Sequence, residues 1–380
     1  MSEEAKTDGH SISVCHVLNA IDESSAEAEW AVRQSKREDV EEVTVLTWFW
    51  DEDFAGRDTI DVECLDIPSG TLRLPREKYG TLRRILERHD VVHTHHNHSA
   101  FYAKLVGWRL GKVIVNTEHN THDGFTRKGR LANGLTNALA DDVVCVSNTV
   151  QSSFQKWERL LVPEDRVRVI YNGVDADRLR AGRNLDWSVR EAAGLDPETL
   201  LVGTAGMLDE QKAHDVLVDA VAIANERSDD PIDLVVSGDG PLHDDLDARI
   251  RASGYADRMH LLGFLETREH VYRMMDELDI YAMPSRWEGF CIAVMEAMWL
   301  GTPCVLSDLP VFRELYDGRA RYHAVDDAEA LASELVALAN DATEREGLGD
   351  RAEEFARSFT IAETVSGYLE AYREHLASED

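Results

Sequence analysis

Two glutamates eight residues apart, Glu288 and Glu296, are the strongest candidates for ligand-binding chemistry in this chain. Glu288 follows the apolar run at 280–283 and the turn at 284–285, and Glu296 lies among strong helix formers. If a helix begins directly after Glu288, a rise of ~1.5 Å per residue places Glu296 about 12 Å further along, on broadly the same side. Because carboxylates are strong acceptors, the pair suits a ligand with hydroxyl groups at both ends.

The stretch between these glutamates is expected to contain a helix N-terminus, where free backbone N–H groups attract anionic oxygens. Gly289 has no Cβ and lets a ligand come close to the backbone. A nucleotide sugar has a hexose, a diphosphate and a ribose at similar separations, so this class of ligand fits the segment. The simpler interpretation is a capping acid followed by an ordinary glutamate of a buried helix.

Lys212 and His119 are the next candidates. Lys212 is the only lysine after residue 156, in a chain that otherwise uses arginine, which favours a specific role over a casual surface charge. His119 stands at the end of the apolar run at 113–116. Taken alone, this histidine is also compatible with structural hydrogen bonding.

Four further histidines, His93, His95, His96 and His98, stand close together. His93 and His95 are expected on one face of a strand, whereas His96 and His98 lie beyond it, so the spacing does not predict convergence on one metal ion. The acidic triplet at 175–177 imitates an Asp-x-Asp metal motif, but such triplets recur freely in so acidic a chain. We therefore expect no metal site.

Short β-rich apolar runs alternate with longer amphipathic stretches along nearly the whole chain. The first series of runs lies at 13–18, 43–47, 91–94, 113–116 and 143–146. The pattern restarts after residue 190, at 200–203, 234–237, 259–262, 280–283 and 304–306. This rhythm is typical of parallel sheets covered by helices, so we expect an α/β protein with two sheets joined within the polar stretch 175–199.

The composition is that of a folded protein with an unusual charge balance. The 380 residues suit two α/β cores, and 43% of them are hydrophobic. Against 40 Lys and Arg stand 72 Asp and Glu, and the net charge of −32 disfavours nucleic-acid binding. Because salt screens the self-repulsion of such a surface, we interpret it as a halophilic adaptation to a salt-rich cytoplasm.

Residues 1–10 are polar and lack the apolar core of a signal peptide, and no run approaches ~20 apolar residues, so we expect a cytoplasmic protein. Five scattered cysteines without a CxxC pair fit reduced thiols. The stretch 72–89 and the later Arg127, Lys128 and Arg130 concentrate positive charge. They are interpreted either as a solvated helix face or as a peripheral contact with anionic lipid at the inner membrane face.

In its motifs and in their order along the chain, the sequence resembles the retaining glycosyltransferases of family 4, which have the GT-B fold. The resemblance covers nearly the whole chain and rests on the Pro-Ser, Glu-Gly-Phe and second Glu of 284–296, the strand and turn at 166–175, and the glycine turn at 237–242. It implies two facing Rossmann-like domains with an interdomain cleft. We place the acceptor-side domain at 1–185, the nucleotide-sugar donor domain at 186–355, and a C-terminal helix that crosses back to the first domain at 356–380.

The resemblance also implies roles for individual residues. Glu288 would contact the donor sugar or phosphate, Glu296 the ribose, and Lys212 the donor phosphate, while His119 would face the cleft and the loop at 93–98 would lie on the acceptor side. Apart from the nucleotide-sugar substrate no cofactor or metal is implied, because Lys212 and helix dipoles would neutralise the leaving diphosphate. The implied catalytic residues are His119, Lys212 and Glu288, and the implied donor-binding residues are Ser24, Ser25, Gly206, Met207, Lys212, Glu288, Gly289, Phe290, Cys291, Ile292 and Glu296.

Two positions depart from the family's pattern, and both would touch the diphosphate. Met207 stands where the family has an arginine, and Ser24-Ser25 stands where it has two glycines. The leading hypothesis is a retaining hexosyl transfer from a nucleotide sugar to the hydroxyl of a sugar or lipid-linked acceptor, in glycan or glycolipid assembly. The alternatives are a non-catalytic GT-B partner in a glycosylation complex, and a sugar phosphorylase or nucleotide-sugar epimerase of the same fold.

Overall fold

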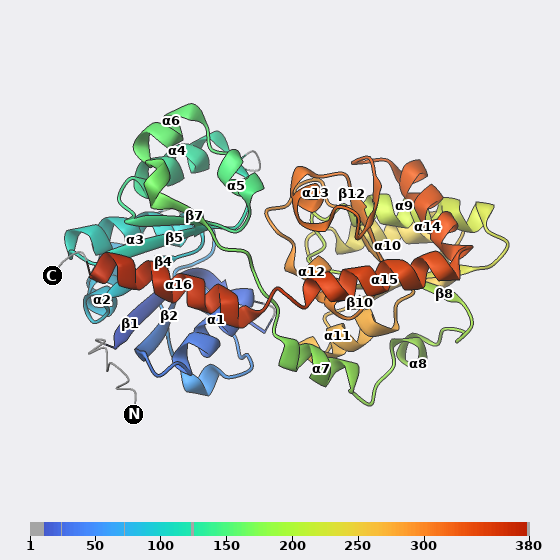
Figure 1. The fold of residues 1–380 in the computed structure, drawn as a ribbon, viewed down its shortest axis with the longest axis horizontal. Helices are drawn as coiled ribbons and strands as arrows, with labels where there is room; N and C mark the ends of the chain where they lie inside the picture. Colours follow the sequence, from blue (N-terminus) through green and yellow to red (C-terminus); the bar gives the residue numbers. More distant parts are fainter. Residues whose placement is uncertain (1–10, 24, 72, 123–124, 378–380) are drawn as a thin grey trace, which may run out of the picture. The chain divides into compact units, whose positions relative to one another are not determined.

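The computed structural model describes residues 11–23, 25–71, 73–122 and 125–377, and it divides the chain into two compact units (Figure 1). The first unit consists of Met1–Tyr171 and Ile361–Asp380, and the second is Asn172–Thr360. Each unit has its own parallel sheet. The expectation of an α/β protein with two sheets is therefore confirmed.

In the first unit, seven strands among the described residues pair in the order β3-β2-β1-β4-β5-β6-β7. These strands are β1 Ile12–Ile21, β2 Val40–Asp51, β3 Asp61–Cys64, β4 Val91–Thr94, β5 Val113–Glu118, β6 Asp142–Cys145 and β7 Val167–Val169. The helices are α1 Ala26–Ser35, α2 Arg76–Glu87, α3 Asn97–Arg109, α4 Arg127–Asn137, α5 Asn148–Ser152, α6 Lys156–Leu161 and α16 Ile361–Leu376, with short 3-10 turns at Arg57–Thr59 and Glu164–Arg166.

Strand β1 lies in the interior of this sheet, between β2 and β4, and is buried on both faces, which explains its nearly continuous apolar sequence. Its side chains alternate between the two faces. Val14 and Leu18 join the core cluster that contains α1 and α16, and Cys15 and Val17 join the cluster that contains α2 and α3. By this alternation His16, although polar and fully buried, lies on the α1 and α16 face.

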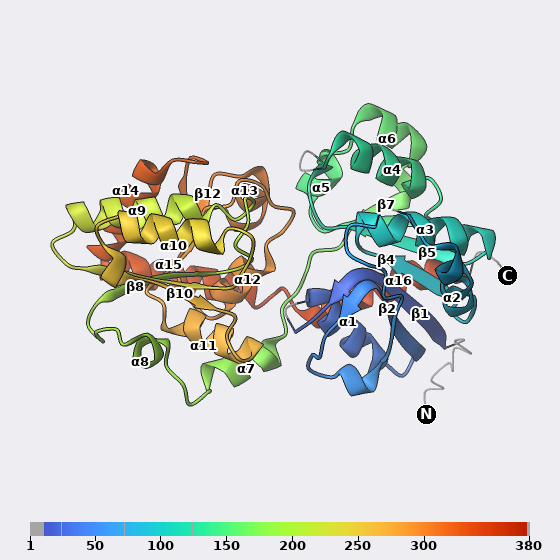
Figure 2. The ribbon, with the colours of Figure 1, turned by 180° about the vertical axis from the view of Figure 1, so that it is seen from behind.

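In the second unit, six strands among the described residues pair in the order β10-β9-β8-β11-β12-β13. They are β8 Leu200–Ala205, β9 Ile232–Ser237, β10 Met259–Gly263, β11 Ile280–Met283, β12 Cys304–Ser307 and β13 Arg321–His323. The helices are α7 Ala176–Arg183, α8 Val189–Ala193, α9 His214–Arg227, α10 His243–Ala252, α11 Arg268–Glu277, α12 Ile292–Trp299, α13 Pro310–Tyr316, α14 Ala328–Ala339 and α15 Ala342–Ala356, with a 3-10 turn at Ala256–Arg258. Figure 2 shows α9 and α10 side by side on this unit.

The two units divide at 171/172 and at 360/361, whereas the expected boundaries lie at 185/186 and at 355/356. Helix α7 packs on α11 of the second unit, and a Cβ on Gly182 would lie 2.5 Å from the Cβ of Tyr272, so glycine permits this contact. Helix α15 belongs to the second unit, whereas α16 returns to the first. There it buries Tyr368 and Tyr372 completely, and Figure 1 shows it lying along the first sheet.

Both sheets have the strand order of an open, doubly wound Rossmann-like fold. The winding direction reverses between β1 and β4 in the first unit and between β8 and β11 in the second. In such sheets ligands bind beyond the carboxyl ends of the strands at these reversal points. None of the helices in the described ranges is long and apolar enough to cross a membrane.

Candidate active site

In the second unit, the loops that follow β8 and β9 are joined by backbone hydrogen bonds at the carboxyl edge of the sheet. Gly206 N–H donates to the Ser237 carbonyl at 3.0 Å, and Leu208 N–H donates to the Asp239 carbonyl at 3.0 Å. A Cβ on Gly238, which has a φ of 131°, would lie 2.0 Å from the Gly206 carbonyl oxygen. The glycine turn at 237–242 is therefore required for the two loops to meet.

Lys212 and Glu288 form a partly buried ion pair between the loops that follow β8 and β11, with 17% of the Lys212 side chain exposed. Lys212 Nζ lies 2.6 Å from Glu288 Oε1, and Gln211 Nε2 donates to Glu288 Oε2 at 3.1 Å. The Ser285 hydroxyl donates to Oε1 at 3.0 Å, and only 6% of Glu288 is exposed. Burial alone would lower the pKa of Lys212, but Cys291 and Glu288 outweigh it and raise that pKa above its usual value. Lys212 is therefore held as a fixed cation.

Helix α12 begins at Ile292, later than the spacing argument assumed. The segment 284–291 forms an irregular loop instead, and its last residue, Cys291, adopts a left-handed conformation with a φ of 65°. Helical rise therefore does not apply between Glu288 and Ile292, so it does not give the separation of Glu288 and Glu296. Cys291 caps α12 without a side-chain hydrogen bond, so the first turn of the helix keeps backbone N–H groups that no N-cap side chain satisfies.

Glu296 belongs to a different contact network from Glu288. Its Oε1 accepts from Arg268 Nη2 at 2.6 Å and from the Tyr272 hydroxyl at 3.0 Å, and only 3% of the residue is exposed. Arg268 and Tyr272 stand four residues apart on α11 and so share one face of that helix. The sequence reasoning missed both residues, although this spacing of a cation and a phenol was a usable signal.

The other implied donor-binding residues of the second unit surround the ion pair or the start of α12. The side chain of Lys212 passes Gly206, since a Cβ there would lie 3.5 Å from its Cε, and Lys212 Nζ lies 3.7 Å from Cys291 Sγ. Met207 is 59% exposed at the tip of its loop. Phe290 is buried, Ile292 is half-buried, and Gly289 lies between Glu288 and Phe290 in the same loop.

In the first unit, the turn between β1 and α1 contains hydrogen bonds between its own residues. Ser25 is the N-cap residue of α1, and its hydroxyl accepts from Asp22 N–H at 3.1 Å and donates to Asp22 Oδ1 at 3.2 Å. Ser24 lies outside the described residues. The family's Gly-Gly turn is thus replaced by one in which at least the second serine hydroxyl bonds to its own turn.

His119 follows β5 and meets groups from α1 and from the loop after β4. Its Nε2 lies 3.2 Å from His95 Nδ1 and 3.7 Å from Glu27 Oε1, and its ring stacks on Trp30 at 5.7 Å between centroids. The side chain is 22% exposed. Burial lowers the pKa of His119 below its ordinary value, which keeps the imidazole neutral at pH 7.

The four clustered histidines separate into two groups. His93 and His95 are buried, with ring centroids 4.1 Å apart, and His96 Nε2 lies 3.8 Å from Glu27 Oε1. His98 instead packs at the start of α3 against Phe49, at 5.4 Å between ring centroids. His98 therefore takes no part in the cluster around His119.

A buried network of charges lies next to His119. Glu118 Oε1 accepts from the side-chain amides of Asn116 at 3.0 Å, Asn133 at 2.6 Å and Asn137 at 2.7 Å. The Lys104 ammonium group donates to the side-chain oxygens of the last two, at 3.2 and 2.6 Å. Its members lie on β5, α3 and α4, so the sequence reasoning did not bring them together.

His122 adds a second cation to this network, since its Nδ1 lies 2.9 Å from Glu158 Oε1 and its Nε2 lies 3.5 Å from Glu118 Oε2. Burial by itself lowers the pKa of His122, but Glu118 and Glu158 outweigh it and raise the pKa to about 9. Burial likewise raises the pKa of Glu118, yet His122 and Lys104 bring it to about 2. The negative charges of Glu118 and Glu158 therefore compensate the positive charges of Lys104 and His122 in the interior next to β5.

This network predicts a pH dependence of stability. The folded pKa of His122 is about 9, above the unfolded value of 6.5, so its contribution is complete below pH 6.5 and is lost as pH rises through 9. Burial lowers the pKa of Lys104 to about 8, and its opposing contribution begins only above that pH. Between pH 6.5 and 8 the contribution of His122 to the free energy of unfolding should therefore fall by about 1–2 kcal/mol. Because histidines with lowered pKa values, such as His16 and His95, oppose this fall over the same range, the measurement is the difference in urea unfolding free energy between the wild type and His122→Gln at constant KCl. That difference should shrink by this amount from pH 6.5 to pH 8, and a difference that does not change with pH would contradict the prediction.

Comparisons with known proteins match both units. Residues 32–178 match the family model described as Glycosyltransferase Family 4, and residues 186–355 match Glycosyl transferases group 1. Over 267 residues the chain is 26% identical to the O-antigen biosynthesis glycosyltransferase WclY of Escherichia coli, covering 67% of this chain and 70% of that protein. It is 27% identical over 309 residues to the D-inositol 3-phosphate glycosyltransferase of Mycolicibacterium gilvum (strain PYR-GCK), covering 76% and 68%.

The fold is similar to the crystal structure of Anabaena Alr3699/HepE in complex with UDP and glucose, with a TM-score of 0.79, 17% identity, and coverage of 96% of this chain and 100% of that one. Two Rossmann-like sheets with this similarity show that the chain has the GT-B fold. The matched models show, more narrowly, that the chain belongs to the family 4 type of glycosyltransferases.

Proposed function

We propose that the chain is a retaining glycosyltransferase that moves a hexosyl group from a nucleotide-sugar donor to an acceptor hydroxyl. The observation that supports this best is the partly buried pair of Lys212 and Glu288 beside the start of α12, whose N-cap forms no side-chain bond. A fixed cation beside a helix N-terminus suits the diphosphate of such a donor. Anabaena Alr3699/HepE, which has the same fold, binds UDP and glucose.

In this proposal each group has a separate task. Lys212 stabilises the charge that develops on the leaving diphosphate, and Glu288 holds Lys212 in place and lies beside the donor sugar. Glu296 accepts from the ribose hydroxyls, with its carboxylate orientated by Arg268 and Tyr272. No metal is needed for these tasks, because the cation comes from the chain itself.

The product is proposed to be a glycan or glycolipid, because the relatives include a transferase of O-antigen biosynthesis. The test is release of nucleoside diphosphate from UDP-, GDP- and ADP-sugars in molar KCl, a salt concentration suggested by the net charge of −32. At least one donor should be turned over, with release accelerated by sugar or lipid-linked acceptors. Binding of a donor without release or transfer from any of them would instead favour a non-catalytic partner.

We further propose that the first unit contacts an anionic membrane through α4 and α6. Exposed leucines lie on both helices, with Leu131 and Leu135 on α4 and Leu160, 84% exposed, on α6. The two helices are in contact. Exposed basic side chains flank these leucines: Arg127, Lys128, Lys156 and Arg159. In a chain of net charge −32, a local surface of this kind suits an anionic lipid headgroup layer.

Sedimentation with vesicles of anionic phospholipid tests this surface. The double substitution Leu131→Ser and Leu160→Ser should weaken vesicle binding at least tenfold in molar KCl, since inserted leucines contribute about 1.5–3 kcal/mol each and salt does not screen them. The exposed Val325 of the second unit, changed to Ser, is the matched control and should leave binding unchanged. Equal sedimentation of wild type and the leucine variant would contradict the proposal.

A further inference from the structure

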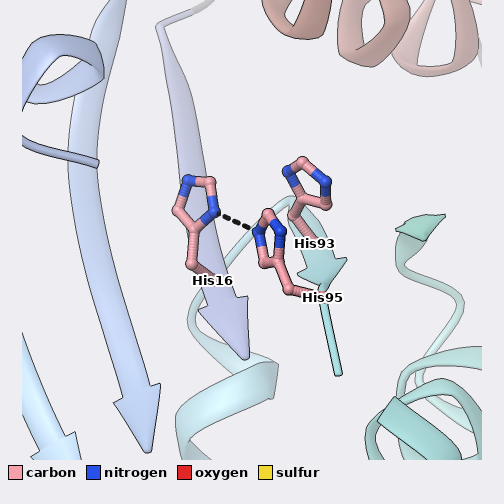
Figure 3. A group of neighbouring side chains, drawn as sticks. All are labelled: His16, His93 and His95. Atoms are coloured by element: carbon pink, nitrogen blue, oxygen red, sulfur yellow. Dashed lines mark hydrogen bonds between the residues drawn. The ribbon is translucent and has the colours of Figure 1, made fainter. Parts of the chain in front are cut away.

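A chain of hydrogen-bonded imidazoles ends at His119. Figure 3 shows His16 and His93 projecting from β1 and β4, with His95 directly after β4. His16 Nδ1 lies 2.9 Å from His95 Nε2, the contact drawn as a dashed line, and His95 Nδ1 lies 3.2 Å from His119 Nε2. At the far end, His16 Nε2 lies 2.8 Å from the side-chain oxygen of Gln34 on α1.

Each imidazole of this chain carries a single proton at neutral pH. Burial lowers the pKa of His16 to about 4, and it also lowers the pKa values of His95 and His119. A neutral imidazole has one N–H donor and one acceptor nitrogen. In an unbroken chain, the direction of the first hydrogen bond therefore fixes the tautomer of every following ring.

The Gln34 amide sets that direction. Its oxygen can only accept, so His16 must donate from Nε2 and accept at Nδ1. His95 then donates from Nε2 and accepts at Nδ1, and His119 donates from Nε2. The orientation of the amide is consistent with its other contact, since Gln34 Nε2 donates to the Tyr372 hydroxyl at 3.5 Å, which in turn can donate to His93 Nδ1 at 2.6 Å.

Glu27 supports the same tautomer independently. Its Oε1 lies 3.7 Å from His119 Nε2, and a carboxylate favours an N–H over a lone pair at that position. Burial alone would raise the pKa of Glu27, but His119 and His96 outweigh it and lower that pKa, so the group is ionised. His96 is held in the same tautomer as His119, because its Nδ1 accepts from Asn19 N–H at 3.2 Å and its Nε2 faces Glu27.

A metal site is the competing interpretation, since ligand atoms of His16, His93 and His95 all lie within 4.8 Å of one another, as do those of Glu27, His95 and His119. In the second group His95 Nδ1 and His119 Nε2 are 3.2 Å apart, a hydrogen-bond distance. However, His93 Nδ1 is 2.6 Å from the Tyr372 hydroxyl, and its Nε2 is 2.7 Å from the Thr117 hydroxyl. The ring planes of His93 and His95 are inclined by only 33°, and their centroids are 4.1 Å apart. The two rings therefore lie over one another and do not direct their nitrogen lone pairs at a common ion. Hydrogen bonds explain these contacts more fully than shared coordination does.

We propose that Gln34, His16 and His95 hold His119 in the tautomer protonated at Nε2, so that Nδ1 accepts a hydrogen bond from a hydroxyl group of the bound sugar. His119 is 22% exposed, and no described residue is seen to bond to its Nδ1. His16, His95 and Gln34 are positioning residues, because they act through His119. The identity of the hydroxyl-bearing ligand as a sugar rests on the proposed function, whereas the tautomer does not.

The tautomer can be measured without any assay of activity. In protein with 15N-labelled histidine, correlations between ring carbon-bound protons and both ring nitrogens distinguish the two neutral tautomers, and His119→Gln assigns the signal. His119 should be neutral and protonated at Nε2. Protonation at Nδ1, or on both nitrogens at neutral pH, would overturn the proposal. So would stoichiometric Zn²⁺ binding that disappears in His16→Asn, since coordination would replace the imidazole hydrogen bonds.

Two substitutions of nearly equal shape test the role of His95. In His95→Asn the side-chain oxygen replaces Nδ1 and still accepts from His119, whereas His95→Leu offers no acceptor. The Asn variant should keep the tautomer and the donor KM of the wild type. In the Leu variant only Glu27, 3.7 Å away, still favours an N–H at Nε2, so the Nδ1-protonated tautomer should become detectable and KM should rise about tenfold, the effect of one hydrogen bond. The same tautomer in both variants would contradict a chain that acts through His95. If neither protein turns over any donor, the proposed function fails while the measured tautomer still decides this inference.

Discussion

Replacing Lys212 by methionine should lower kcat/KM for the nucleotide-sugar donor about a thousandfold. The ammonium group lies 2.6 Å from Glu288 and is held beside the start of α12, where the proposal places the leaving diphosphate. Without it, backbone N–H groups alone would stabilise the developing charge. The measurement is steady-state release of nucleoside diphosphate in molar KCl with the best donor.

This substitution also leaves Glu288 buried without its cation, which costs about 3–5 kcal/mol and could unfold the unit. The double variant Lys212→Met with Glu288→Gln removes the uncompensated charge and keeps Gln211 and Ser285 as neighbours of position 288. It should be nearly as stable as the wild type and still inactive. Arg249→Met, an exposed cation of the same unit, is the control and should keep full activity. Activity of the double variant within tenfold of the wild type would refute the role of Lys212.

Replacing Glu118 by leucine should destabilise the first unit by about 3–5 kcal/mol. This buried carboxylate accepts three amide hydrogen bonds and neutralises Lys104 and His122, so its loss leaves Lys104 without its charged partner and His122 with Glu158 alone. Glu118→Gln keeps an acceptor oxygen and should be destabilised less. Urea unfolding at constant KCl, followed by tryptophan fluorescence, gives the free energies.

The matched control for this prediction is Glu370→Gln on α16, because that glutamate is exposed and surface charges contribute little. It should change the free energy of unfolding by less than about 0.5 kcal/mol. If Glu118→Leu costs no more than the control, the network beneath β5 does not stabilise the unit. His119 follows Glu118 directly, so a destabilised network should also displace the imidazole and reduce activity.

The sequence predicted the features that depend on local periodicity. Apolar runs and amphipathic stretches alternate with the periods of strands and helices, and this was enough to predict two parallel sheets. Lys212 and Glu288 were both singled out from their own surroundings, and the structure brings them together across 76 residues of sequence. Both follow strands at a reversal point of the sheet, where the carboxyl ends of parallel strands meet.

The sequence did not predict the contacts that depend on packing between elements. Glu296 pairs with Arg268 on another helix, and the late start of α12 depends on the left-handed conformation of Cys291, which no rule for non-glycine residues anticipates. The imidazole chain joins residues from β1, α1 and the loops after β4 and β5. Spacing within one segment indicated that His93 and His95 share a side, but could not supply His16 as a neighbour.

Calorimetric titration of UDP, GDP and ADP into the protein in molar KCl tests the central claim most directly, because it needs neither the acceptor nor turnover. The wild type should bind one of these diphosphates, and the double variant Lys212→Met with Glu288→Gln should bind it at least tenfold more weakly, since one charged contact to phosphate is lost. Equal affinities of the two proteins would contradict a donor site built on Lys212 and Glu288.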